Sequence, residues 1–485
     1  MTHAIDGLQP ERVWKYFAEI SRIPRGSKNE ARISAYILQT ARQLGLEAEQ
    51  DESLNVVVRK PASPGREAVP SICLQGHLDM VCEKNSDKVH DFEKDPIELV
   101  RRGNTLMANG TTLGADNGIA VATNLAVMED RTLVHGPLEF LFTVDEEMGL
   151  NGANSLQPGF VTSRILLNLD SEEEGVLYVG CAGGRNTEGI WKLAADSAPA
   201  GAAPMLLKVR GLRGGHSGLE IDKGRGNSLK VLVRALLALE KASLRIGRMA
   251  GGNKSNAIPR EADALVWIPA KKVQTAARII AQFQATVQAE LQTVEPALTV
   301  TLDESPGAER NTVWKRTLQK KILRALSALP HGVIKMSADI AGLVETSTNL
   351  AIVRSEPAQF TVITSQRSSV ASELDEIQHS VGSIFELAGA RVQYAEGYPG
   401  WKPNMDSPIL QIAKSTYQQL FGREPDVKAI NAGLECGIIG QRYPGMDMIS
   451  FGPTLESVHS PEEKIHIDTV PDFYAFLLAI LNRMQ

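Results

Sequence analysis

The stretch Ser71-Ile-Cys-Leu-Gln-Gly-His-Leu-Asp-Met80 decides how the rest of the sequence is interpreted. Its apolar first half predicts a short buried strand that runs into Gly76. Residues two apart in an extended segment point to the same side, so we expect His77 and Asp79 to face one site. A neutral imidazole is the commonest side-chain ligand of zinc, and a nearby carboxylate often orients such a ring. Taken alone, the pattern favours a histidine hydrogen-bonded to a carboxylate at a sheet margin over a metal site.

Two later apolar segments also end in carboxylates. Residues 138–144 predict a strand that runs into Glu146 and Glu147. Residues 164–170 predict another strand, which ends at Asp170. Ligands of open α/β sheets gather at the carboxyl ends of the strands. Adjacent acids there repel one another unless water solvates them or cations neutralise them, so a solvated loop and a metal site both remain open.

A glycine-flanked aspartate and a late histidine complete this set. Asp116 lies between Gly114 and Gly118, which let the backbone turn tightly near a ligand, although Asp116 alone fits a helix cap better. His459 follows a strand predicted over residues 446–451. Histidines and carboxylates in this combination suit a pair of divalent ions that share one carboxylate. Their convergence is much less expected by chance than any member alone, so the sequence predicts a two-metal site.

The overall composition limits the other possibilities. A chain of 485 residues exceeds what one hydrophobic core usually organises, so we expect two or more domains. The net charge of −6 argues against nucleic acid as a partner. No apolar run approaches the roughly 20 residues of a membrane span, and the first residues show no secretory signal. The four cysteines contain no CxxC pair, which suits reduced thiols, so we expect a cytoplasmic protein without a membrane partner.

Seven motifs resemble those of the M20 family of di-zinc metallopeptidases. Four of them are Gly76-His-Leu-Asp79, Gly114-Ala-Asp-Asn-Gly118, Asp145-Glu-Glu-Met-Gly149 and Asn168-Leu-Asp-Ser-Glu172. The others are Gly214-Gly-His-Ser-Gly218, Asn431-Ala-Gly-Leu-Glu-Cys-Gly437 and Val458-His-Ser-Pro461. Together they span nearly the whole chain and are most similar to the bacterial M20 dipeptidases that act on aminoacyl-histidine substrates.

The resemblance implies a role for each residue of the predicted metal site. The implied ligands of two Zn²⁺ ions, for which Co²⁺ or Mn²⁺ are possible substitutes, are His77, Asp116, Glu147, Asp170 and His459. His77 and Asp170 would hold one ion and Glu147 and His459 the other, with Asp116 bridging them. Asp79 would orient the His77 ring, and Glu146 would act as general base toward a hydroxide between the metals. A cis peptide bond after Asp116 is also implied.

The implied function is hydrolysis of dipeptides, above all of aminoacyl-histidine (Xaa-His, carnosine-like) substrates. Two alternatives keep the same metal residues: a di-zinc aminoacylase or deacylase, and a dipeptidase of broader specificity. The implied fold is α/β, with a mixed-sheet di-zinc catalytic domain and an inserted α+β lid domain. From changes in composition along the sequence we place the catalytic domain at residues 1–186 and 397–485 and the lid at 187–396. We expect residues 194–204, which are mostly small residues and prolines, to form a linker.

The predicted lid carries the expected substrate-binding residues. Two glycines before His216 and one after it let the chain present this ring at a tip, and the resemblance makes it a donor to the substrate. Weaker candidates for holding the substrate carboxylate are Asn256, Asn349 and Arg367, and an arginine fork suits this task. A weak sequence similarity between residues 255–291 and 348–387 predicts an internal duplication. The family's lids often dimerise, so a homodimer through the lid is possible.

Overall fold

The computed structural model describes residues 4–305 and 312–484. The chain divides into two compact units. The first contains Met1–Gly180, Trp401–Ala429 and Leu434–Gln485, and the second contains Cys181–Gly400 and Ile430–Gly433. This division differs by a few residues from the predicted boundaries at 186/187 and 396/397, and it assigns four late residues to the second unit. The prediction about a secretory signal falls partly on residues 1–3, which lie outside the described residues.

An eight-stranded mixed sheet forms the centre of the first unit. Its strands are, in spatial order, β1 (Glu47–Gln50), β2 (Val56–Lys60), β6 (Leu138–Thr143), β3 (Ile72–His77), β7 (Ile165–Asn168), β23 (Asp447–Ser450), β8 (Val176–Cys181) and β22 (Asp426–Ile430). β6, β3, β7 and β23 run parallel to one another, whereas β2 is antiparallel to β6. Because β6, β3 and β7 are adjacent and parallel, their carboxyl ends meet at one edge of the sheet.

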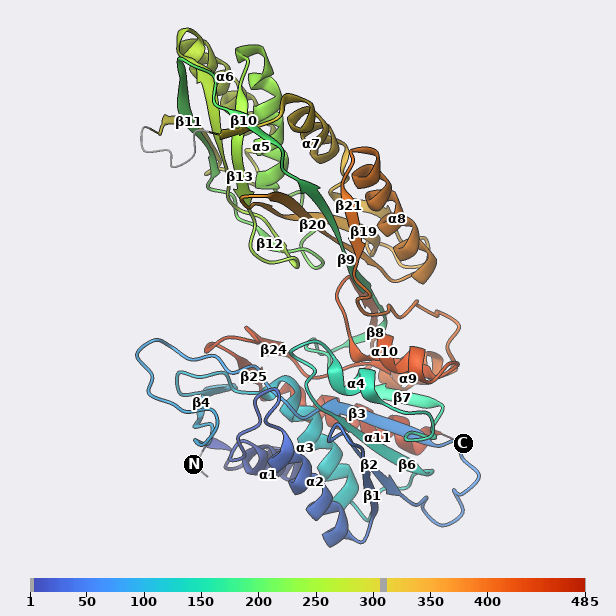
Figure 1. Ribbon diagram of the computed structural model, residues 1–485. Helices are drawn as coiled ribbons and strands as arrows, with labels where there is room; N and C mark the ends of the chain where they lie inside the picture. The colour runs from blue at the N-terminus through green and yellow to red at the C-terminus, as the bar shows by residue number, and fades with distance from the viewer. Residues whose placement is uncertain (1–3, 306–311, 485) are drawn as a thin grey trace. The chain divides into compact units, whose positions relative to one another are not determined.

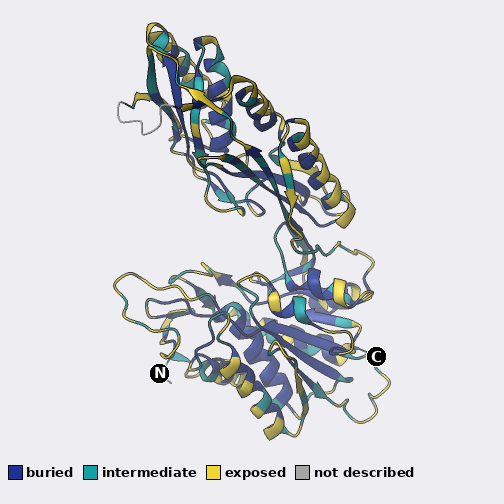
Figure 2. Cartoon of the chain, in the orientation of Figure 1, coloured by how far each residue is buried: buried dark blue, intermediate teal, exposed yellow. Residues whose placement is uncertain are grey.

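Helices cover this sheet on both faces. Every residue of β3 and β6 is buried, which requires a covering layer on each side of the strands (Figure 2). α3 packs on β3 and α1, while α9 packs on β23 and α11 (Figure 1). The helices of this unit are α1 (Glu11–Ile20), α2 (Ala31–Leu44), α3 (Ala115–Glu129), α4 (Asn151–Ser155), α9 (Pro408–Phe421), α10 (Glu435–Arg442) and α11 (Thr469–Arg483).

A smaller sheet beside the large one carries the last motif. It contains β24 (Leu455–Glu456), β25 (Lys464–His466), β5 (Thr105–Ala108) and β4 (Leu99–Arg102), in that order. The loop between β24 and β25 contains His459. Among residues 4–305 and 312–484, no helix combines the length and the apolar character that crossing a membrane requires.

A nine-stranded antiparallel sheet forms the second unit. Eight of its strands are, in spatial order, β16 (Thr299–Glu304), β11 (Ala202–Arg210), β15 (Ala262–Pro269), β13 (Arg245–Gly251), β19 (Val344–Ser355), β20 (Gln359–Ser368), β9 (Gly183–Lys192) and β21 (Arg391–Tyr394), and β18 (Gly332–Met336) pairs with β19. The helices α5 (Ser228–Ala238), α6 (Val273–Leu291), α7 (Arg316–Ala328) and α8 (Ala371–Leu387) share one hydrophobic core with it.

The same order of elements occurs twice in this unit. One series is β11–α5–β13–β15–α6–β16, and the other is β9–α7–β19–β20–α8–β21. When the four strands of each series are numbered along the chain, their spatial order in the sheet is 4-1-3-2 in the first series and 2-3-1-4 in the second. The two orders are mirror images about the neighbouring strands β13 and β19. Each series has the strand–helix–strand–strand–helix–strand connection of ferredoxin-like units. The first series lies within the connection from β9 to α7 of the second.

One local prediction in this region is wrong. Residues 194–204 do not form a linker, because they contain β10 (Ala195–Ser197), which pairs with β17 (Thr312–Trp314), and the start of β11. Small residues and prolines were a poor guide here, since Pro204 lies within β11 and is accommodated in the sheet. The predicted fold class, an α/β protein with a mixed-sheet unit and an inserted α+β unit, is confirmed.

Candidate active site

The predicted metal residues of the first unit converge at the carboxyl ends of its central strands. His77 is the last residue of β3 and is 1% exposed. Glu146 and Glu147 follow β6, and Asp170 follows β7. Because these three strands are neighbours, residues separated by almost a hundred positions in sequence arrive at one place.

Asp116 lies between the two predicted histidine ligands. Its Oδ1 is 3.1 Å from Nε2 of His77, and its Oδ2 is 3.1 Å from Nε2 of His459. The peptide bond from Asp116 to Asn117 is cis, and both residues have non-helical dihedral angles inside α3. One carboxylate therefore contacts both rings, with one oxygen directed to each.

Each imidazole also contacts a second carboxylate. Nε2 of His77 lies 3.5 Å from Oδ1 of Asp170, and Nε2 of His459 lies 3.0 Å from Oε2 of Glu147. Among the described residues, two groups of potential ligand atoms, each within 4.8 Å of one another, share Asp116: His77, Asp116 and Asp170, and Asp116, Glu147 and His459. A third group in the same place joins His77, Glu146 and Glu147.

The chemistry of these donors fits divalent metal ions. Imidazole nitrogen and carboxylate oxygen are the ligands that zinc and similar ions take in catalytic sites. The other oxygen of Glu147, Oε1, is buried and has no hydrogen-bond partner among residues 4–305 and 312–484. A buried carboxylate oxygen without a donor is costly, and a cation would satisfy it. Three carboxylates around two rings would also repel one another without added positive charge.

Asp79 has a wider role than the predicted orientation of His77. Its Oδ1 lies 3.3 Å from Nδ1 of His77 and accepts a hydrogen bond from the backbone N–H of Glu146 at 3.0 Å. Its Oδ2 accepts from the backbone N–H of Glu147 at 3.2 Å and from Ser27 Oγ at 2.8 Å. This fully buried carboxylate therefore fixes both the His77 ring and the backbone that carries the two glutamates.

Electrostatics divide the carboxyl groups into two kinds. Burial would raise the pKa of Asp116, but hydrogen bonds from His459 and His77 hold it below the usual range. For Asp170 and Glu146, burial and neighbouring acids raise the pKa well above the usual range, against the opposing effect of His77. Hydrogen bonds to Asp116 and Glu147 raise the pKa of His459 to about 11. The cluster thus shares too few positive charges for all of its acids to ionise.

Among the buried acids beside the cluster that sequence reasoning missed, one lies at the start of α10. Glu435, at the start of α10, is fully buried and accepts hydrogen bonds from Gln75 Nε2 at 2.6 Å and Thr143 Oγ1 at 2.8 Å. Burial raises its pKa to about 7, and the nearby His77 opposes this shift. The only signal in the sequence was its position in the motif 431–437, which did not indicate a role.

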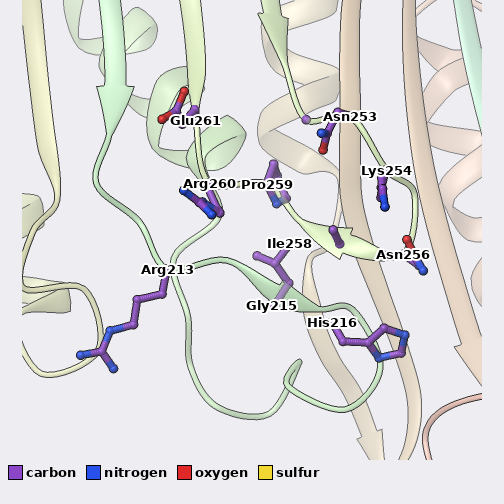
Figure 3. Close-up of a pocket in the computed structure, with 12 residues that line it drawn as sticks. Arg213, Gly215, His216, Asn253, Lys254, Asn256, Ile258, Pro259, Arg260 and Glu261 are labelled. Atoms are coloured by element: carbon purple, nitrogen blue, oxygen red, sulfur yellow. The ribbon is translucent and has the colours of Figure 1, made fainter. Parts of the chain in front are cut away.

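The four predicted substrate-binding residues all belong to the second unit. His216 forms the two-residue strand β12 (Gly215–His216), which pairs with β14 (Ala257–Ile258), and Asn256 precedes β14. Figure 3 shows His216 and Asn256 on a pocket of about 780 Å³ that also has Arg213, Lys254 and Arg260 in its lining. With one acid, Glu261, these three basic side chains give the lining a net positive charge.

The ring of His216 has a defined tautomer. Its Nδ1 accepts hydrogen bonds from the backbone N–H groups of Gly218 at 3.2 Å and Leu219 at 3.0 Å. An acceptor nitrogen carries no proton, so the neutral ring has its proton on Nε2. Burial, and next the charge of Arg367, lower the pKa of His216 to about 4. His216 is therefore a neutral side chain with one N–H donor available.

Asn349 and Arg367 lie on one face of the second unit's sheet. Arg367 on β20 pairs with Ser347 on β19, and Asn349 follows two residues later, so all three point to the same side. Nη1 of Arg367 donates to the hydroxyl of Tyr398 at 2.9 Å. Nε of Arg367 and Oδ1 of Asn349 are buried without a hydrogen-bond partner in the part of the chain that the structure describes.

Two further polar residues on this face were not predicted. Nδ2 of Asn431 donates to the carbonyl of Gly218 at 3.3 Å and to Ser347 Oγ at 3.1 Å, which attaches the late segment 430–433 to the loop after His216. Tyr398 approaches the sheet above Gly184, where any Cβ would lie 2.6 Å from the tyrosine hydroxyl. A glycine in a strand was the only hint of this close approach.

Comparison with known proteins agrees with this geometry. Residues 73–483 match the family described as peptidase family M20/M25/M40. The chain belongs to this family. It is therefore a hydrolase acting on peptide bonds, and the family's peptidases are metal-dependent, in keeping with the ligand groups described above. The resemblance inferred from the motifs is confirmed.

Similar proteins cover almost the whole chain. The cytosol non-specific dipeptidase of Escherichia coli (strain K12) is 41% identical over 98% of this chain and 98% of its own length. The crystal structure of the aminoacylhistidine dipeptidase from Vibrio alginolyticus superimposes with a TM-score of 0.91 at 40% identity, covering 99% of this chain and 98% of that one. The aminopeptidase PepT from Bacillus cereus, at 16% identity and a TM-score of 0.58 over 98% of both chains, shares the fold.

We expect His216 to titrate near pH 4 in the folded protein, well below the ordinary 6.5, because burial and Arg367 disfavour its charged form. Between these pH values the unfolded chain binds a proton that the folded chain does not. The contribution of His216 therefore makes the free energy of unfolding fall as the pH falls through this window. NMR titration of ¹⁵N-histidine-labelled protein, assigned with His216→Gln, measures the midpoint. Arg367→Gln should raise it, and a wild-type midpoint at or above 6.5 would contradict the assigned environment.

Proposed function

We propose that this protein is a cytosolic dipeptidase that uses two Zn²⁺ ions and accepts a range of dipeptides, aminoacyl-histidines among them. The observation that carries the proposal is Asp116, whose two oxygens face one histidine each. The two relatives near 40% identity support the dipeptide as substrate, since both are named dipeptidases, one non-specific and one for aminoacylhistidines. The name of the Escherichia coli relative supports the cytosolic location.

Each proposed metal position has its own ligands. His77 and Asp170 would hold one ion, Glu147 and His459 the other, and Asp116 would bridge them. When bound, such a pair lowers the pKa of a water molecule and polarises a carbonyl group. Asp79 fixes the positions of the two ligand sets relative to each other, because it contacts the His77 ring and the backbone N–H of Glu147.

Glu146 is the proposed general base. It lies beside Glu147 and its carboxylate is close to His77 and Glu147, but it does not join the two groups that share Asp116. Its backbone is fixed by Asp79, and burial raises its pKa, which favours a group that takes up a proton during the reaction. Glu146 would remove a proton from the attacking water and deliver it to the nitrogen of the leaving amino acid. The two adjacent glutamates therefore have different proposed roles, Glu146 as general base and Glu147 as metal ligand.

Substrate recognition is proposed for the second unit. The N–H of a neutral His216 suits an oxyanion, because it donates without needing to lose a proton in the reaction. Nε of Arg367, which has no hydrogen-bond partner among the described residues, suits the carboxylate at the end of a dipeptide. The amide groups of Asn256 and Asn349 are further candidates for this contact. A site that requires this carboxylate one residue beyond the scissile bond favours dipeptides over longer chains. The doubled series of elements supports our proposal that this unit, the predicted lid, is an internal duplication. The homodimer through the lid stays a prediction.

A substrate panel tests the proposed function. We expect metal-loaded enzyme to hydrolyse several unblocked dipeptides, including Xaa-His, at much higher kcat/KM than tripeptides or N-acyl amino acids. Amidating the dipeptide's carboxyl end should abolish hydrolysis, since it removes the charge that Arg367 would bind. Faster hydrolysis of N-acyl amino acids than of dipeptides would instead identify a deacylase of the same family. Activity on Xaa-His alone would replace the broad range with the narrow one.

Glu146→Gln and Glu147→Gln should have different effects although the residues are adjacent. Glu146→Gln removes only proton transfer, so we expect kcat to fall by about 10²–10⁴ while both metal ions remain bound. Glu147→Gln removes a ligand, so we expect one ion to bind more weakly. Elemental analysis of metal content and steady-state kinetics measure the two effects. Equal metal loss in both variants would remove Glu146 from the role of base.

His216→Ala should lower kcat by about 10²–10³, the usual effect of losing an oxyanion donor, while folding and metal content stay unchanged. His379→Ala, which removes an exposed histidine of the same unit, is the matched control. Unchanged kcat in His216→Ala at saturating substrate would eliminate the role. Mixing His216→Ala with Glu146→Gln chains then shows whether His216 acts within its own chain or across a dimer, because only the second arrangement restores activity.

A further inference from the structure

Two buried charged residues outside the proposed ligand set hold the loop that carries Asp116. Arg25 and Glu463 are each 2% exposed, although charged side chains are rarely buried without a partner. Both are directed at the backbone of residues 113–116. They approach this loop from different parts of the first unit, since Arg25 follows α1 and Glu463 lies in the loop between β24 and β25.

Glu463 accepts a hydrogen bond from every backbone N–H of residues 113–116. Its Oε2 accepts from Leu113 at 2.7 Å and Gly114 at 2.9 Å. Its Oε1 accepts from Ala115 at 2.7 Å and Asp116 at 3.3 Å. Glu463 follows His459 by only four residues. This carboxylate therefore joins the loop that carries His459 to the backbone of Asp116.

Arg25 joins the same loop to the end of β3. Nη1 donates to the carbonyl oxygens of Leu78 and Asp79, both at 2.9 Å, and Nη2 donates to the carbonyl of Gly114. Gly114 and Gly118 leave room for this guanidinium, since a Cβ at either position would lie 2.6 Å from Nη2. Leu78 and Asp79 directly follow His77. The glycines around Asp116 thus make space for Arg25, which explains their place in the motif.

We propose that Arg25 and Glu463 are positioning residues that set the two distances from Asp116 to its histidines. Arg25 fixes Asp116 relative to His77, and Glu463 fixes it relative to His459. The proposal rests on the metal centre proposed above and adds residues that touch neither metal nor substrate. It predicts that Arg25 supports the metal position at His77 more than the other position, and that Glu463 supports the metal position at His459 more.

The variants follow from hydrogen-bond chemistry. Glu463→Gln keeps the size of the side chain but offers the four N–H groups one acceptor oxygen and an NH₂ donor, so the attachment to Asp116 weakens. Arg25→Lys keeps the charge but loses the fork that reaches two backbone segments at once. Glu462→Gln and Arg22→Lys change exposed neighbours of the same type and serve as matched controls.

Binding of Co²⁺ to the metal-free chain, followed by its visible absorption, tests the proposal. Spectra of His77→Ala and His459→Ala assign the two positions. We expect Glu463→Gln to weaken binding at the position lost in His459→Ala by about 10–100-fold, the usual effect of altering a residue that supports a ligand. Arg25→Lys should weaken the position lost in His77→Ala by a similar factor. Both controls should bind two ions as the wild type does.

The outcomes separate this proposal from the proposed function. If the wild type binds two ions and cleaves dipeptides while Glu463→Gln binds both ions as tightly, the positioning role is overturned and the function stands. If the wild type does not bind a pair of ions, the metal centre itself is wrong. Equal weakening at both positions, with a lower melting temperature of the metal-free protein, would indicate general destabilisation and overturn the proposal. Should Glu463→Gln not fold, Glu463→Asp, which keeps the charge but shortens the reach, should show the same preference for one position.

Discussion

The first unit is organised around one carboxylate, Asp116, whose side chain is only 13% exposed and lies between two imidazoles. Burying a charge is costly unless an opposite charge or several hydrogen bonds compensate. Here the compensation is divided, because His77 and His459 each take one oxygen and each contacts another acid. The shared carboxylate therefore couples the two ligand groups, and a displacement of either ring changes the environment of the other.

A surrounding layer of polar contacts makes this arrangement rigid. Asp79 holds one imidazole and two glutamate backbones, and Glu435 is held by donors from β3 and β6. These acids are buried among apolar strands, so their hydrogen bonds operate where water does not compete. Burying so many acids at the end of an otherwise apolar sheet costs stability. Such a cluster of acids with shifted pKa values is typical of a functional site.

The residues that meet at the ends of strands were predictable from the sequence because their pattern is local. An apolar run followed by His77, by Glu146 or by Asp170 is visible in a few residues, and parallel strands bring such ends together. Arg25 and Glu463 were not predictable in this way, since they act on backbone groups and any segment of chain presents the same N–H and C=O groups. The pairing of Asn431 with the loop after His216 was also hidden, because it depends on four residues that leave one unit and enter the other.

The repeated series in the second unit has a consequence for how its sheet is held together. β13 and β19, which meet where the two series join, are segments of the same polypeptide, with Ala250 opposite Arg354 and Gly251 opposite Val353. In a pair of separate chains such a junction would come apart on dilution, whereas a covalent connection keeps its local concentration constant. The two series also differ from each other: the connection from the first strand to the first helix is short in one series, where it carries His216, and in the other it contains the whole first series. A single chain with two unlike series thus has an asymmetry that two identical copies could not have.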